Sequence, residues 1–112
     1  MEELIDAHDQ AWLDNDPEAV GALFTDEGAF VDLAGGETVG RENIIRYAEG
    51  HVELITESRP TGPVESQGNG TFHYPTHLVV AEIRSGTYTG VVAVDVKDGL
   101  LARYDLSEVG RQ

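Results

Sequence analysis

The chain contains no cysteine. Disulfide bonds, a thiolate nucleophile and zinc sites built on cysteine are therefore excluded. It also lacks an apolar run long enough to cross a bilayer. Its first residues, Met1-Glu2-Glu3-Leu4, are acidic and lead straight into a helical pattern, unlike a signal peptide. We therefore expect a cytoplasmic protein.

Positive charge is scarce. Seven lysine and arginine residues face 21 aspartate and glutamate residues, for a formal net charge of −14, and Lys97 is the single lysine. Such a surface repels phosphate backbones and anionic lipids. We expect neither a nucleic-acid partner nor a membrane partner.

What remains is typical of one folded domain. The 112 residues, of which 40% are hydrophobic, suit a single hydrophobic core. No repeat or linker divides them, so residues 1–112 are predicted to form one domain.

Helical patterns dominate the first half. Residues 3–14 place apolar side chains on one face of a helix. Asp16 and Pro17 are typical of an N-cap and a first turn, and they predict a second helix that ends before residue 26. A third helix is predicted over residues 41–57, where apolar-face positions recur at helical spacing: Ile44, Ala48, His51 and Ile55.

Strand patterns dominate the second half. Residues 29–33 form a first short strand candidate, and Gly35-Gly36 a turn after it. Residues 72–84 predict a strand in which Pro75 requires a bulge or an edge position. Residues 87–96 and 100–106 are predicted to pair through a hairpin turn at 97–99. The loop at 58–70 includes a short strand near 64–67. Helices followed by a meander indicate an α+β fold.

Several motifs together resemble the NTF2-like superfamily, most closely its SnoaL-like polyketide cyclase and ketosteroid isomerase branch. They span nearly the whole chain: Trp12–Asp16, Ala22–Ala29, Val31-Asp32, Gly40–Ile44 and Val94–Leu100. The resemblance implies a cone in which three N-terminal helices pack on a curved mixed or antiparallel sheet. It also implies a deep, mostly apolar pocket for a small apolar ligand, with no cofactor.

The resemblance also implies site residues. Asp32 falls where the ketosteroid isomerases carry a catalytic aspartate, and His8 falls where they carry a hydrogen-bonding tyrosine. Their second carboxylate would fall near Val91, and the next carboxylate of this chain is Asp95. Between Val31 and Leu33 the Asp32 carboxylate is expected to be poorly solvated, which suits a proton acceptor.

Each of these two residues also has a purely structural interpretation. Asp32 can instead bind the backbone N–H groups of the 35–36 turn. His8 lies on the apolar face of its helix and can be a core residue. If both face the pocket, Asp32 takes a proton beside a carbonyl, and His8 polarises or reprotonates the oxygen.

Further residues are expected around the pocket. The substrate-binding set comprises Trp12, Phe30, Tyr47, His51, His77, Tyr88 and Tyr104. Asp105 is another catalytic candidate because the Arg103-Tyr104-Asp105 ending is similar to that of limonene-epoxide-hydrolase-like members. Strand alternation places Asp105 away from Tyr104, where it can pair with Arg103. No metal site is predicted, since four strand residues separate His73 from His77 by roughly 13 Å.

Val92, Val94 and Val96 form an apolar stripe on one strand face. In the family this face, opposite the pocket, usually packs against a second copy. We therefore expect a homodimer through this stripe.

Three functions are consistent with the sequence. The first is a cofactor-free SnoaL-like enzyme of isomerase or cyclase type, acting by acid/base proton transfer on an apolar carbonyl substrate. The second is a non-catalytic ligand-binding or dimerisation module. The third is a limonene-epoxide-hydrolase-like hydrolase, which needs a second carboxylate beside Asp32 in the cavity.

Overall fold

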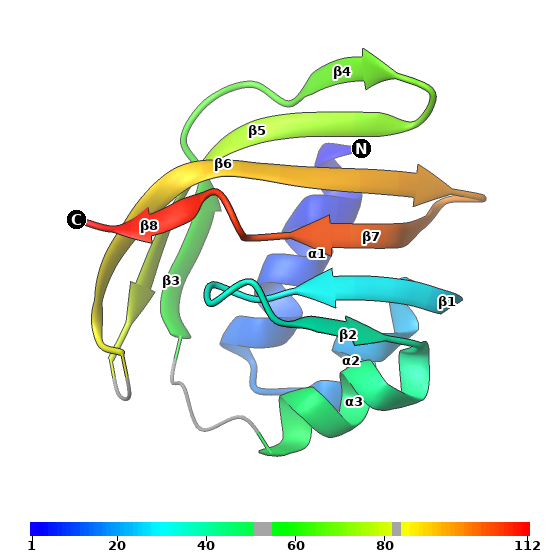
Figure 1. Cartoon of the computed structure of the whole chain (residues 1–112), viewed down its shortest axis with the longest axis horizontal. Coiled ribbons are helices and arrows are strands. Elements are labelled where there is room, and N and C mark those ends of the chain that lie inside the picture. Colours follow the sequence, from blue (N-terminus) through cyan, green and yellow to red (C-terminus); the bar gives the residue numbers. More distant parts are fainter. Residues whose placement is uncertain (51–54, 82–83) are drawn as a thin grey trace.

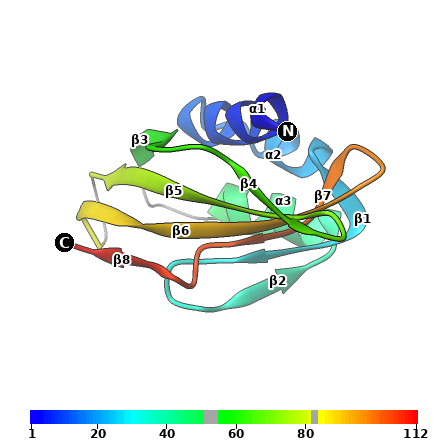
Figure 2. The ribbon, with the colours of Figure 1, turned by 90° about the horizontal axis from the view of Figure 1, so that it is seen from above.

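The computed structural model describes residues 1–50, 55–81 and 84–112. Within them, helices lie on one face of a curved eight-stranded sheet (Figures 1 and 2). The helices are α1 (Glu2–Leu13), α2 (Pro17–Ala22) and α3 (Arg41–Gly50). The strands are β1 (Phe24–Val31), β2 (Glu37–Val39), β3 (Ile55–Pro60), β4 (Glu65–Gly68), β5 (Thr71–Val80), β6 (Gly86–Lys97), β7 (Leu100–Asp105) and β8 (Val109–Arg111).

The strand order is β2-β1-β7-β6-β5-β3, with β4 added to β5 and β8 added to β6. Strands β1 and β7 are parallel, and all other pairs are antiparallel. The expected α+β fold with a curved mixed sheet is confirmed. No helix in the described ranges has the length and apolar composition that a membrane crossing requires.

The start of α2 follows the predicted N-cap. Pro17 occupies the first turn, and the Asp16 carboxylate accepts a hydrogen bond from the Ala19 N–H at 3.2 Å. This bond satisfies one of the amides that a helix start leaves without a partner.

Replacing Asp16 with alanine is expected to lower the free energy of unfolding by about 1 kcal/mol, because the N-cap acceptor is lost. Urea unfolding followed by circular dichroism measures the change. The matched control is Asp16→Asn, which keeps a side-chain oxygen and should lie close to wild type. Equal destabilisation by both variants would contradict an N-cap role.

Several predicted boundaries are wrong. The strand predicted over residues 72–84 ends at Val80, and residues 58–60 of the predicted loop belong to β3. The first strand begins at Phe24 and not at residue 29, because the Arg41 side chain donates to the carbonyl groups of Gly21 and Phe24 and closes the end of α2 there. The third helix ends at Gly50, and residues 55–57 belong to β3. The intervening 51–54, with the predicted site residue His51, lie outside the described residues.

Two predicted turns and edges are confirmed. Pro75 lies in β5 between the part that pairs with β4 and the part that pairs with β3, where its missing N–H breaks no ladder. The turn from β6 to β7 uses Asp98 and Gly99 at φ 53° and 80°, as a tight hairpin requires.

The valine stripe faces the opposite way from the prediction. Val92 and Val94 are 0% and 1% exposed and belong to the core that also contains Ile5 of α1. Their neighbour Val91, which points to the other face, is 44% exposed. The helix layer therefore already covers the stripe proposed for dimerisation, and a second copy cannot pack there.

Candidate functional site

A cavity lies between α1, α3 and the covered face of the sheet. The cavity is partly open to solvent. Its wall is formed by α1, α3, β3, β5 and the ends of β1 and β7. The lining residues are His8, Asp9, Trp12, Phe30, Asp32, Leu33, Tyr47, Ile55, Ser58, Thr76, Leu78, Tyr104 and Leu106.

His8 is held by its neighbours on α1 and β7. It is 1% exposed, and its Nε2 accepts a hydrogen bond from the Trp12 indole N–H at 3.1 Å. Its ring stacks on Tyr104 with 4.0 Å between ring centroids. Because Nε2 is an acceptor, we assign the proton of the neutral ring to Nδ1. That nitrogen lies 3.5 Å from the Asp9 carboxylate.

Asp9 is the least satisfied polar group of the cavity. It is 4% exposed, and neither carboxylate oxygen accepts a hydrogen bond of ordinary geometry from the described residues. Buried polar groups nearly always have partners, and a buried carboxylate without one is costly. This carboxylate is therefore a group that a bound molecule can satisfy.

Asp32 follows β1 and is tied to its own turn. Its Oδ1 accepts hydrogen bonds from the N–H groups of Ala34 and Gly36, both at 2.9 Å. Its Oδ2 accepts a hydrogen bond from the Tyr47 hydroxyl at 3.2 Å. The two interpretations of Asp32 from sequence thus both describe part of its surroundings, since the same carboxylate holds the turn and lines the cavity.

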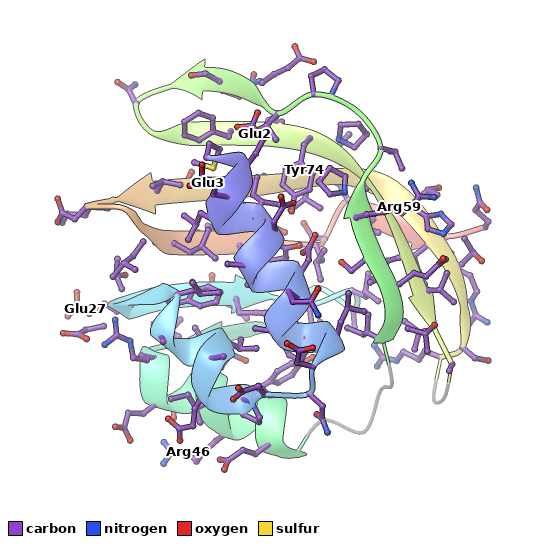
Figure 3. The ribbon with its side chains drawn as sticks, turned by 180° about the vertical axis from the view of Figure 1, so that it is seen from behind. Glu2, Glu3, Glu27, Arg46, Arg59 and Tyr74 are labelled. Atoms are coloured by element: carbon purple, nitrogen blue, oxygen red, sulfur yellow. The ribbon has the colours of Figure 1, made fainter. Side chains whose placement is uncertain are left out.

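The hydroxyl groups of Tyr74 and Tyr104 form a hydrogen bond beneath α1. The Tyr74 hydroxyl donates to the Tyr104 oxygen at 3.1 Å, and Figure 3 shows Tyr74 beside α1. Burial raises the pKa of Tyr104 well above its usual value, and the nearby Tyr74 and Asp9 raise it further. Burial and Asp9 likewise raise the pKa of Tyr74. Both phenols are therefore protonated at neutral pH.

These two raised pKa values make stability depend on alkaline pH. A tyrosine whose pKa is higher in the folded state gives its full stabilisation below pH ~10, and this is lost as the pH rises further. We expect the unfolding free energy to fall above that pH. Ultraviolet absorbance of tyrosinate should show Tyr74 and Tyr104 ionising only with unfolding. Ionisation of both near pH 10 in the folded protein would contradict this expectation.

A family model described as a SnoaL-like domain matches residues 5–104. The chain belongs to this SnoaL-like family. No curated protein matches the sequence.

Solved structures resemble this SnoaL-like domain over most of its length. One is a protein with a ketosteroid isomerase-like fold from Catenulispora acidiphila in complex with trimethylamine. Its TM-score is 0.75 at 18% identity, with 92% of this chain and 82% of that chain covered. Another is RV0760c from Mycobacterium tuberculosis, with a TM-score of 0.75, 17% identity, and 92% and 86% covered. An NTF-2-like protein of unknown function from Burkholderia xenovorans has a TM-score of 0.69, 15% identity, and 92% and 77% covered. At these identities the likeness shows the fold.

The cavity of the SnoaL-like domain collects most of the residues named from the sequence. Those that line it are His8, Trp12, Phe30, Asp32, Tyr47 and Tyr104. Three others lie elsewhere. The His77 ring is 3.0 Å from the Glu57 carboxylate, Tyr88 donates to the Arg84 carbonyl, and Asp105 accepts from the Ser107 N–H.

Asp105 also lies 3.7 Å from the Arg103 guanidinium. Hydrogen bonding to Ser107 and the charge of Arg103 outweigh partial burial and lower the pKa of Asp105. This pairing agrees with the strand alternation and leaves the side chain outside the cavity. Among the described residues, no three histidine, aspartate or glutamate side chains converge as metal ligands.

Asp9 is the charged lining residue that the sequence analysis did not predict. It lies four residues after Ile5 and three before Trp12, which is the spacing of one helix face. Its position in the apolar pattern was the available signal.

Proposed function

We propose that this SnoaL-like domain is a cofactor-free enzyme of isomerase or cyclase type, moving a proton on a small, mostly apolar carbonyl compound. The observation that supports it is the Asp32 carboxylate in the wall of an aromatic cavity. Two backbone N–H groups orient its Oδ1, and a phenol contacts its Oδ2. A carboxylate held in one orientation is suited to general base catalysis.

In this proposal Asp32 takes the proton from the carbon beside the carbonyl, and negative charge develops on the carbonyl oxygen. Hydrogen-bond donors aimed at that oxygen stabilise the charge. Two donors line the cavity near each other: the Nδ1–H of His8 and the hydroxyl of Tyr104, whose rings are stacked. The proton then returns from Asp32 to another carbon of the substrate.

The cavity wall suits such a substrate. Trp12, Phe30 and Tyr47 form one aromatic group, with ring centroids 5.4–6.4 Å apart. Pockets for small molecules are typically apolar, with a few polar groups that orient the ligand.

The test is proton exchange in D₂O, which needs no knowledge of the product. Small ketones and lactones are incubated with the protein, and NMR follows the loss of the protons beside the carbonyl. The proposal expects exchange faster than in buffer for at least one shape class. Binding of the same compounds without exchange would contradict it.

A non-catalytic binding module is the second candidate. The observation that favours it is the capping of the 35–36 turn by Asp32, a role that requires no chemistry. The exchange experiment separates the two, because a binding module takes up ligands and leaves their protons in place.

Epoxide hydrolysis is the third candidate, since it needs a second carboxylate in the cavity with Asp32. Asp9 occupies such a position and Asp105 does not. Ring opening of a simple epoxide by the wild-type protein, followed by NMR, tests this candidate directly.

A further inference from the structure

The charges around the cavity are one-sided. Among the residues that the structure describes, two carboxylates line it, Asp9 and Asp32. None of the seven lysine and arginine residues does so, and all seven lie in the described part of the chain. In a weakly polar environment the electric field of these carboxylates attracts cations and repels anions more strongly than it would in water.

The two carboxylates differ in how far the protein already satisfies them. Asp32 accepts three hydrogen bonds. Asp9 is 4% exposed and accepts none of ordinary geometry among the described residues. Asp9 is therefore the carboxylate that lacks a hydrogen-bond donor of ordinary geometry or a positive charge beside it.

His8 does not supply a positive charge to Asp9. A histidine cation carries a proton on both ring nitrogens. The Nε2 of His8 accepts the indole proton of Trp12, which leaves the ring neutral, with Nδ1 3.5 Å from Asp9. The other groups close to Asp9 are the protonated phenols of Tyr74 and Tyr104. The Tyr104 hydroxyl interacts with the Asp9 carboxylate as a neutral donor, although without ordinary hydrogen-bond geometry. None of them carries a positive charge.

Aromatic faces supply the second half of a cation site. The ring of Trp12 lies 5.5 Å from that of Phe30 and 6.4 Å from that of Tyr47, measured between centroids. The electron-rich faces of such rings attract ammonium groups, most strongly where water is excluded.

From these observations we propose that the natural ligand of the cavity carries a positively charged ammonium nitrogen on an apolar body, bound beside Asp9 against the aromatic wall. The inference rests on the proposed function in taking the cavity as the ligand site. It adds the charge of the ligand, and it assigns Asp9 to ligand recognition while Asp32 keeps the proton transfer.

The test compares three probes of similar size and different charge: choline, its neutral carbon analogue 3,3-dimethylbutan-1-ol, and the anion 3,3-dimethylbutanoate. Trp12 is the only tryptophan and lines the cavity, so its fluorescence reports binding at this place. Choline is expected to bind at least about tenfold more tightly than the alcohol, and the anion more weakly than both. Equal affinities, or no response to choline, would overturn the inference.

Matched variants localise the effect. Asp9→Asn keeps the size of the side chain and removes its charge, so the advantage of choline over the alcohol should shrink to within about twofold. Asp6→Asn makes the same change on the exposed face of α1 and should preserve the advantage. An advantage that survives Asp9→Asn would overturn the assignment of Asp9. The comparison of the three probes on the wild-type protein tests the charge of the ligand even if a variant fails to fold.

Failure of this inference is distinguishable from failure of the proposed function. Proton exchange on neutral ketones with no preference for choline would overturn the ammonium ligand and leave the enzyme intact. A preference for choline with no exchange on any carbonyl compound, cationic or neutral, would support the ligand class and contradict the enzyme.

Discussion

Replacing Val92 with aspartate is expected to prevent folding. Val92 is 0% exposed and packs in the core beneath the helices. An unpaired charge placed there loses its hydration. The most damaging substitutions of this kind lower the free energy of unfolding by more than about 4 kcal/mol. A domain of this size has about 5–15 kcal/mol of stability in total. Circular dichroism and thermal unfolding of the purified variant measure the effect.

The matched control lies one residue away. Val91→Asp makes the same change on the uncovered face of β6, where the side chain is 44% exposed, and the monomer should remain folded. Tolerance of Val92→Asp together with loss of folding in Val91→Asp would reverse the assigned faces of the sheet. The proposed homodimer needs a surface other than the Val92 stripe, and a change of mass in the Val91→Asp variant would locate it at Val91.

Asp32→Asn is expected to lower the rate of carbonyl proton exchange by about 100-fold or more, since a general base contributes about that factor. The amide keeps an oxygen that can accept from Ala34 and Gly36, so the turn should persist. The oxygen next to Tyr47 is replaced by an NH₂ group, which cannot accept a proton. The measurement is the exchange rate at saturating substrate, with a binding titration alongside it.

Two controls frame that result. Asp98→Asn makes the same chemical change in an exposed hairpin turn at φ 53°, a conformation that asparagine tolerates, and should exchange protons at the wild-type rate. Thermal unfolding shows whether Asp32→Asn has disturbed the turn. A stable Asp32→Asn variant with full activity would remove Asp32 from the chemistry.

The α+β order was predictable because local chemistry marks its boundaries. Asp16 and Pro17 mark the start of α2, and Asp98-Gly99 marks the β6–β7 turn. The third helix was predicted too long because Ile55 continues the helical spacing of Ile44. In the structure Ile55 instead pairs with Val80 of β5, a partner 25 residues away along the chain. Spacing alone contains no information about such a partner.

The faces of β6 show the same limit. The alternation of side chains correctly places Val92 and Val94 on one face of the strand and Val91 on the other. It does not say which of the two faces is buried. Which side is buried depends on where α1 packs, and that is a tertiary choice.

The aromatic part of the site was predictable because large aromatic side chains are usually buried in cores and pocket walls. Trp12, Phe30, Tyr47 and Tyr104 all line the cavity. Asp9 was not predicted, because a charged residue in an acidic chain is most simply assigned to the surface. Only the packing of α1 against the sheet makes it a buried, unpartnered carboxylate.

The parallel pairing of β1 with β7 has a consequence for how the chain reaches this fold. Phe24 pairs with Leu101 and Val31 with Asp105, so more than 70 residues separate strands that lie side by side (Figure 1). Contacts so distant along the chain close large loops and slow folding. During synthesis the β1–β7 pair cannot form before β7 emerges. The Asp32 turn and the Tyr104 wall therefore come together only after β7 has left the ribosome.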